Sequence, residues 1–283
     1  MYMTGKKLRP KTEPMYSGGN ICDFDITSGY DTVDYSDFIF SHIFKSEDIL
    51  ISQSVQNGFF SGIFASSKLY KPRPMITLHI GRNYNDFLVF AKEECQLVNG
   101  KSKSIYSLAC DEKFGVGVFF MEGYGTKQAI IDCTDDIEER WDDGLKITSC
   151  AALNSSFYII MTKGTKEYHG KQQMWFTRGS WKRANDEIQE GYREGKAITG
   201  ICYSRGLKLY FVVMTASMGR QCSRWFDRTE EEAMNDWEQK KHDEGFYPTI
   251  IFNDPTDNKT LIVMTEDKNR SGYVSRAGYK LRY

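Results

Sequence analysis

Residues 141–178 read WDDGLKITSCAALNSSFYIIMTKGTKEYHGKQQMWFTR. Residues 192–228 follow the same order, as YREGKAITGICYSRGLKLYFVVMTASMGRQCSRWFDR. A third copy begins at Gly245 and reaches its own apolar run and Met264-Thr265 about 20 residues later. Each copy has a glycine, a strand-like stretch containing Ile-Thr or Thr-Ile, and an apolar run that ends in Met-Thr. The recurrence indicates a repeat architecture.

Five glycines mark equivalent points of this pattern: Gly58, Gly100, Gly144, Gly195 and Gly245. Their mean spacing is about 47 residues, a period typical of propellers, solenoids and repeat arrays. Because the same residue returns before a new strand each time, we expect these glycines to need a positive φ that other residues adopt only at a cost.

Each unit contains three strand-like runs and a polar segment with helical spacing. In residues 229–241 the pair Thr229 and Glu232 fits a capping box, and Ala233 and Trp237 share one helical face. The sequence therefore predicts an all-β chain with short connecting helices.

A β-propeller-like ring explains such units best, because radial repetition leaves few sheet edges exposed. The length of 283 residues favours about six blades of roughly 47 residues, with five as the alternative and an open β-solenoid as the rival. We expect one repeat domain over residues 1–283, in which residues 1–44 form a degenerate unit that closes the ring and residues 45–283 form five repeats.

The composition excludes several classes of protein. Charged residues make up 27% of the chain, yet the net charge is −1, which disfavours a nucleic-acid partner attracted by bulk charge. No run of about 18 apolar residues is present, so no membrane-spanning helix is expected. The first ten residues lack the apolar core of a secretory signal, which points to the cytoplasm.

Cysteine usage also points to a reducing compartment. The seven cysteines are odd in number, and no two are spaced as C-x-x-C. Cys110, Cys150 and Cys202 fall on apolar strands at matching places of successive units, so we expect small buried thiols rather than disulfides.

The repeat resembles a known family. Gly-Leu-Lys-Ile-Thr (144–148) and Tyr-Ile-Ile-Met-Thr-Lys-Gly-Thr-Lys (158–166) are similar to the units of the non-catalytic C-terminal repeat domain of plant casein-kinase-I-like proteins. The resemblance extends over residues 45–283 at the level of the repeat. The kinase half has no counterpart here, since the chain lacks a glycine-rich nucleotide loop, a His-Arg-Asp loop and Asp-Phe-Gly. The resemblance implies a shared module without kinase activity.

Signals for chemistry are weak. Lys163-Gly-Thr-Lys166 does not have the spacing of a phosphate-binding P-loop, and the four histidines have no metal-ligand spacing. The acidic residues of 135–143 fall in a polar connection, where a solvated face is expected. We therefore predict no catalytic residues, no cofactor and no metal.

The recurring polar and aromatic side chains are the best candidates for an interaction surface. We select eight of them: Thr162, Gln172, Trp175, Arg178, Thr215, Gln221, Trp225 and Arg228. They could converge on one face of a ring and bind a ligand. The competing interpretation, which we favour two to one, is that residues recurring in every unit join neighbouring units.

Three functions are consistent with these patterns. The first is a non-enzymatic intracellular scaffold that binds a protein partner or a larger assembly. The second is a lectin-like propeller in which Trp175, Trp181 and Trp225 stack on sugar rings. The third is an enzyme of unrecognised type with a pocket in the central channel.

Overall fold

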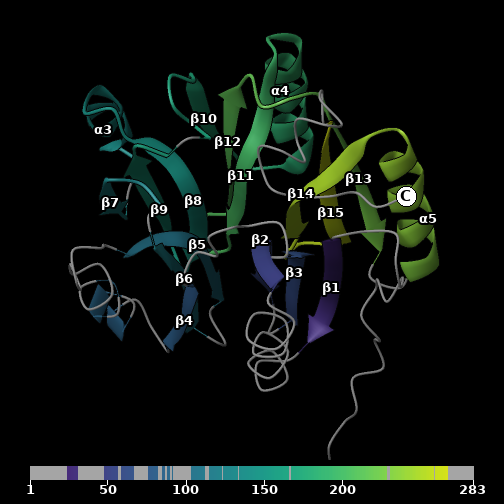
Figure 1. The fold of residues 1–283 in the computed structure, drawn as a ribbon, viewed down its shortest axis with the longest axis horizontal. Helices are drawn as coiled ribbons and strands as arrows, with labels where there is room; N and C mark the ends of the chain where they lie inside the picture. The colour runs from purple at the N-terminus through teal and green to yellow at the C-terminus, as the bar shows by residue number, and fades with distance from the viewer. Residues whose placement is uncertain are drawn as a thin grey trace, which may run out of the picture.

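The computed structural model describes residues 24–30, 48–56, 59–66, 76–81, 85–86, 88–89, 91, 103–111, 115–122, 124–132, 134–165, 167–227, 230–257 and 259–266. These residues form five antiparallel sheets of three strands each (Figure 1). The prediction of an all-β chain with short connecting helices is confirmed for them.

All five sheets share one topology, in which the third strand lies between the first and the second. The first strands are β1 (Phe24–Tyr30), β4 (Ile76–Gly81), β7 (Lys127–Ile131), β10 (Gln173–Arg178) and β13 (Gln221–Asp227). The second strands are β2 (Asp48–Gln56), β5 (Lys103–Asp111), β8 (Lys146–Leu153), β11 (Lys196–Ser204) and β14 (Phe246–Asn253). The third strands are β3 (Phe59–Ser66), β6 (Gly115–Glu122), β9 (Ser156–Lys163), β12 (Leu209–Ala216) and β15 (Lys259–Glu266).

The apolar runs of the repeat form the middle strands. In β9, β12 and β15 six consecutive residues are buried, because a middle strand is covered on both faces by other elements. Such strands read as continuous apolar runs rather than as an alternation.

The second strand of each sheet carries a β-bulge at the same place. The register with the third strand shifts between Leu50 and Ser52, Ile105 and Ser107, Ile147 and Ser149, Ile198 and Gly200, and Pro248 and Ile250. A bulge leaves one residue without its ladder bonds and bends the strand. Pro248 is tolerated inside β14 because it stands at this bulge.

Helices connect the first strand to the second within each of the last three sheets. They are α3 (Ile137–Asp142), α4 (Trp181–Arg193) and α5 (Glu231–Asp243), and Figure 1 shows all three at the periphery of the molecule. The predicted helix over residues 229–241 is confirmed as α5, although Thr229 lies outside the described residues. None of the helices in the described part of the chain is long and apolar enough to cross a membrane.

The glycine prediction is confirmed where the structure tests it. Gly144, Gly195 and Gly245 have φ values of +79°, +74° and +88°, and each follows a helix and precedes a second strand. Gly58 and Gly100 lie outside the described residues.

The core lies between sheets rather than within one. One buried cluster joins residues of β5, β8 and β9, a second joins β8 and β9 to β11 and β12, and a third joins β11 and β12 to β14 and β15. The second strands carry these contacts from sheet to sheet: β2 contacts β5, β5 contacts β8, β8 contacts β11, β11 contacts β14, and β14 contacts β2. Trp141 of α3 and Tyr192 of α4 pack against the second and third clusters.

Two details of the predicted organisation need correction. The described residues contain five sheets and not six, because β1 pairs with β3 and so completes the first sheet instead of opening another unit. The expected boundary at residues 44 and 45 therefore divides that sheet. The last run of the second, third and fourth predicted units is the first strand of the following sheet, since β7 pairs with β9, β10 with β12 and β13 with β15.

Candidate functional site

Three buried threonines of the repeat are each held by two neighbours. Thr162, Thr215 and Thr265 end the apolar runs and are at most 2% exposed. Their hydroxyls share hydrogen bonds of 2.8, 2.7 and 2.8 Å with the hydroxyls of bulge residues on the adjacent second strands. Those bulge residues are Thr148, Thr199 and Thr249.

A glutamine of the first strand completes each arrangement. The side-chain Nε2 atoms of Gln128, Gln173 and Gln221 donate to the same three threonine hydroxyls over 2.8, 3.1 and 3.0 Å. We call each set of two threonines and one glutamine a Gln-Thr-Thr clamp.

Each glutamine also reaches the preceding sheet. The Oε1 atom of Gln173 accepts from the backbone N–H of Ile147 over 2.8 Å, and its Nε2 atom donates to the carbonyl of Ile147 over 2.9 Å. Gln128 binds the backbone of Ile105 in the same way, and Gln221 binds that of Ile198. Since these isoleucines stand directly before the bulge, the amide supplies partners where the ladder is interrupted.

These contacts favour the structural interpretation of Thr162, Thr215 and Gln221, which join one sheet to the next. Gln172 is not the counterpart of Gln221, which corrects the alignment of the repeats: the register pairs Gln173 with Thr215. Gln172 is exposed, and its backbone carbonyl accepts from the N–H of Ala216. Successive residues of a strand point to opposite faces, so only one of the two glutamines can face the clamp.

The two tryptophans are not equivalent. Trp175 pairs with Val213, two positions beyond Gln173, whereas Trp225 pairs with Leu261, four positions beyond Gln221. Trp175 stacks on Phe211 with ring centroids 5.7 Å apart. Trp225 meets the ring of Trp181 edge to face at 4.9 Å. All three tryptophans are half buried and pack on other aromatic rings.

The two arginines differ as well. Arg178 forms an ion pair with Glu187 of α4, and its guanidinium lies 5.7 Å from the centroid of Phe176. This side chain fastens α4 to β10. Arg228 lies outside the described residues.

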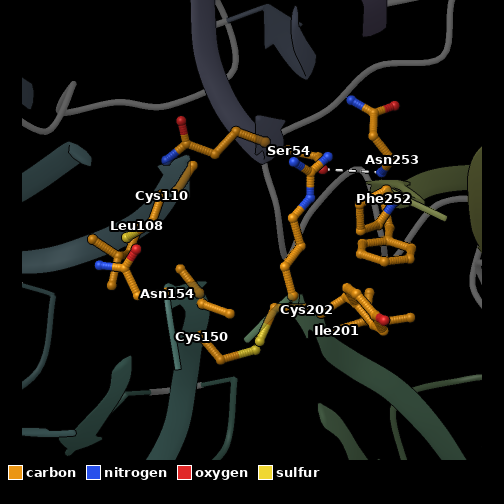
Figure 2. Close-up of a pocket in the computed structure, with 16 residues that line it drawn as sticks. Ser54, Leu108, Cys110, Cys150, Asn154, Ile201, Cys202, Phe252 and Asn253 are labelled. Atoms are coloured by element: carbon orange, nitrogen blue, oxygen red, sulfur yellow. Dashed lines mark hydrogen bonds between the residues drawn. The ribbon is translucent and has the colours of Figure 1, made fainter. Parts of the chain in front are cut away.

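The seven described members of the predicted set are therefore not gathered at one site. A pocket forms instead where the second strands of all five sheets approach one another (Figure 2), and we call it the axial pocket. It holds about 620 Å³ of space, part of it open to solvent. Its lining consists of Gln53, Ser54, Leu108, Ala109, Cys110, Cys150, Ala151, Ala152, Asn154, Ile201, Cys202, Tyr203, Arg205, Phe252, Asn253 and Pro255.

Hydrogen bonds between second strands fix the walls of the axial pocket. The backbone N–H of Asn253 on β14 donates to the Ser54 hydroxyl on β2 over 3.0 Å, shown as the dashed line in Figure 2. Gln53 donates to the hydroxyl of Ser107 over 2.9 Å. The N–H of Leu108 donates to the hydroxyl of Ser149 over 3.1 Å.

The mouth of the pocket is built by turns that follow the second strands. Asn154 lies in the turn after β8 with a φ of +53°, and its carbonyl accepts from the buried Ser204 hydroxyl over 2.8 Å and from the Gly206 N–H over 3.1 Å. These two bonds hold the turn that carries Arg205 against the turn that carries Asn154.

Among the described residues that line the pocket, Arg205 carries the one charged side chain, and the buried carboxylate of Asp254 lies next in sequence to two other lining residues, Asn253 and Pro255. The Oδ2 atom of Asp254 accepts from the Tyr210 hydroxyl over 2.5 Å, and its Oδ1 atom accepts from both the N–H and the hydroxyl of Thr256. Burial raises the pKa of Tyr203; Asp254 raises it further, while Arg205 opposes the rise. Both charges therefore act on this wall of the pocket.

Three thiols line the other wall. Cys110, Cys150 and Cys202 are not in disulfides, and neither is Cys222 elsewhere. They do not occupy matching places, which corrects the sequence interpretation. Counted from the bulge in each second strand, Leu108, Cys150 and Ile201 occupy equivalent positions. Cys202 lies one residue further along its strand than this position, and Cys110 lies two residues further along.

In the part of the chain that the structure describes, no group of three or more His, Cys, Asp or Glu side chains could hold a metal ion. No model of a known protein family matches the sequence, and a search of curated proteins finds no relative.

Sequence reasoning missed the clamp glutamines Gln128 and Gln173, and it named a pocket in a central channel without identifying the residues that line the axial pocket. The clamps left a signal, since Ile147-Thr148 and Ile198-Thr199 recur together with the Met-Thr pairs. The axial pocket has no such repeat signal, because its lining residues differ from one unit to the next.

Proposed function

We propose that this chain is a five-bladed β-propeller that acts without catalysis, as a module that binds a protein partner at its axial pocket. The proposed setting is the reducing cytoplasm, where thiols are the resting state of cysteine, and none of the four cysteines in the described part of the chain is in a disulfide. Membership in the repeat family of plant casein-kinase-I-like proteins is part of the same proposal.

Contacts among the second strands support the ring. The series of contacts runs from β2 through β5, β8, β11 and β14 and back to β2. The bond from the N–H of Asn253 to Ser54 joins residues of the last and the first sheet over 3.0 Å. In an open array, where a unit contacts only its sequence neighbours, this contact would not form.

The axial pocket is the observation that carries the binding proposal. The repeated Gln-Thr-Thr clamps join neighbouring sheets. Selective binding of one partner therefore has to come from residues that differ from sheet to sheet. Gln53, Asn154, Arg205 and Asn253 are such residues, and all four line the pocket. Convergent polar groups over an apolar floor are typical of a binding site.

A protein partner suits this site better than a sugar or a reacting substrate. The three tryptophans proposed to stack on sugars pack on protein rings instead. The described residues that line the pocket include no His, Asp, Glu or Lys, side chains that often serve in general acid and base catalysis. Turns that carry Asn154 and Arg205 surround the mouth and can contact a larger surface.

A charge reversal at the mouth tests the proposal. Tagged full-length protein, its Arg205→Glu variant and its Lys208→Glu variant are used to capture partners from the native source, with quantitative mass spectrometry. Lys208 is the matched control, because it is exposed in the same turn and does not line the pocket.

We expect the wild type and Lys208→Glu to capture the same partner in similar amounts, and Arg205→Glu to capture at least tenfold less of it. Equal recovery by all three proteins would overturn binding at this pocket. Recovery of glycans, or turnover of a small molecule blocked by Arg205→Glu, would replace the proposal with the lectin or the enzyme.

A further inference from the structure

Two of the thiols in the axial pocket lie close to each other although they belong to different sheets. Cys150 is on β8 and Cys202 is on β11, two second strands that pack together. Figure 2 shows their side chains turned toward each other at the floor of the pocket, and the thiol of Cys202 is within hydrogen-bonding reach of that of Cys150.

The backbone of β11 gives an independent measure of this proximity. A Cβ atom built on Gly200 would stand 3.1 Å from the Sγ atom of Cys150. Cys202 follows Gly200 by two residues in a regular part of β11. The Cys202 side chain and a Cβ atom at Gly200 therefore point to the same face of the strand. The Cys150 sulfur therefore lies over the stretch of β11 from which the Cys202 side chain projects.

The two thiols differ in how deeply they are buried. Cys150 is half buried and Cys202 is 7% exposed, and both line a pocket that opens to solvent. A small peroxide can enter such a pocket. We propose that Cys150 and Cys202 are an oxidation site, at which a peroxide converts the two thiols into a reversible disulfide between the third and fourth sheets.

The chemistry has two steps. The Cys150 sulfur attacks one oxygen of hydrogen peroxide, the O–O bond breaks, one water leaves with the thiol proton, and Cys150 becomes a sulfenic acid. The Cys202 sulfur then attacks the Cys150 sulfur, the S–O bond breaks, and a second water leaves with the Cys202 proton. Two thiols lose two electrons in total, one peroxide gains them, and the product is one disulfide and two waters.

Burial sets the order of these steps. It raises the pKa of the Cys202 thiol well above its usual value, so Cys202 is the poorer first nucleophile and acts as the resolving thiol. Closing the bond brings the sulfur atoms from hydrogen-bonding distance to about 2.05 Å. A thiol reductant reverses it by exchange.

Mass spectrometry of the full chain tests this inference. Reduced protein is treated with hydrogen peroxide, denatured in acid without reductant, and measured intact and after proteolysis. We expect a loss of about two mass units, from the two hydrogens removed with a disulfide, and a cross-linked peptide pair that contains Cys150 and Cys202. A thiol reductant should restore the original mass.

Three variants assign the roles. Cys150→Ser and Cys202→Ala should not form the bridge, and in Cys202→Ala a sulfenic-acid trap such as dimedone should label Cys150. Cys222→Ser, at a half-buried thiol on β13 outside the pocket, should form the bridge as the wild type does. Circular dichroism and urea unfolding establish that each variant is folded before oxidation.

A bridge from either cysteine to Cys110, dimedone labelling at Cys110 instead of Cys150, or only irreversible sulfinic and sulfonic products would overturn the assignment. So would a bridge that forms equally well in wild-type protein unfolded in urea, since the pairing would then not depend on the fold. These readouts are chemical and do not depend on whether the pocket binds a protein partner.

Discussion

At the scale of single residues, the Gln-Thr-Thr clamp explains why the repeat keeps its polar residues inside an apolar core. A buried amide or hydroxyl destabilises a fold unless it is hydrogen-bonded. Here the Gln173 amide makes three hydrogen bonds, two to Ile147 and one to Thr215. The cost of burial is thus offset in a way that also fixes how one sheet sits on the next.

The neighbouring glutamines give a matched test of this explanation. Gln173→Ala should lower the free energy of unfolding by about 1–3 kcal/mol, because it leaves the N–H of Ile147 unpaired in a buried place. Gln172→Ala should change it by less than about 0.5 kcal/mol, since Gln172 is exposed. Urea unfolding of both variants measures the difference. Equal effects would mean that the clamp contributes no more than an ordinary surface contact.

At the scale of elements, each helix is joined to the following strand by a glycine at positive φ. Gly195 follows α4, its N–H donates to the carbonyl of Tyr192 over 3.1 Å, and β11 begins at the next residue. This is the usual role of glycine just beyond a helix C-terminus. The chain reverses here without a longer loop and places β11 beside the next second strand.

Replacement of Gly195 isolates the cost of the backbone conformation. No atom lies within 4 Å of a Cβ built there, so Gly195→Ala creates no clash and should destabilise the protein only through its φ of +74°. We expect a loss of about 1–2 kcal/mol, measured by thermal or urea unfolding. Gly179→Ala is the control, since that Cβ would make only ordinary contacts of 3.8 Å or more. If both variants unfold alike, the positive φ at Gly195 has no measurable cost.

At the scale of the whole molecule, stability depends on contacts between sheets, because each buried cluster in the described part of the chain joins two sheets. The clusters join consecutive sheets, and β14 meets β2 at the Asn253–Ser54 bond. If the sheets form a ring, removing part of the first sheet should destabilise the last sheet as well.

Deletion of residues 1–44 tests that response. The deletion removes β1, which leaves β3 with an open edge and loosens β2. Because β2 contacts β14, amide hydrogen exchange in β14 and β15 should accelerate along with that in β2 and β3. Exchange in β9, near the middle of the chain, serves as the internal reference. Full protection of β14 and β15 beside a loosened first sheet would instead favour an open array.

The sequence by itself determined the repeat, its period and the type of its elements. Runs such as Phe157–Met161, rich in aromatic and β-branched residues, are typical of buried strands. Glycines at equivalent points, such as Gly144 and Gly195, indicated a positive φ, which the structure shows. These features depend on local chemistry and recur at a fixed spacing, so a single chain displays them several times.

Tertiary structure alone decided which strands share a sheet, which glutamine faces the clamp, and where the pocket lies. A period of about 47 residues is the same whichever strand opens the unit, so only the pairing of β7 with β9 assigns β7 to the later sheet. Gln172 and Gln173 are identical in type, and only register separates them. The residues of the axial pocket come from five second strands far apart in sequence, and nothing but the packing of those strands brings Ser54 to Asn253 or Cys150 to Cys202.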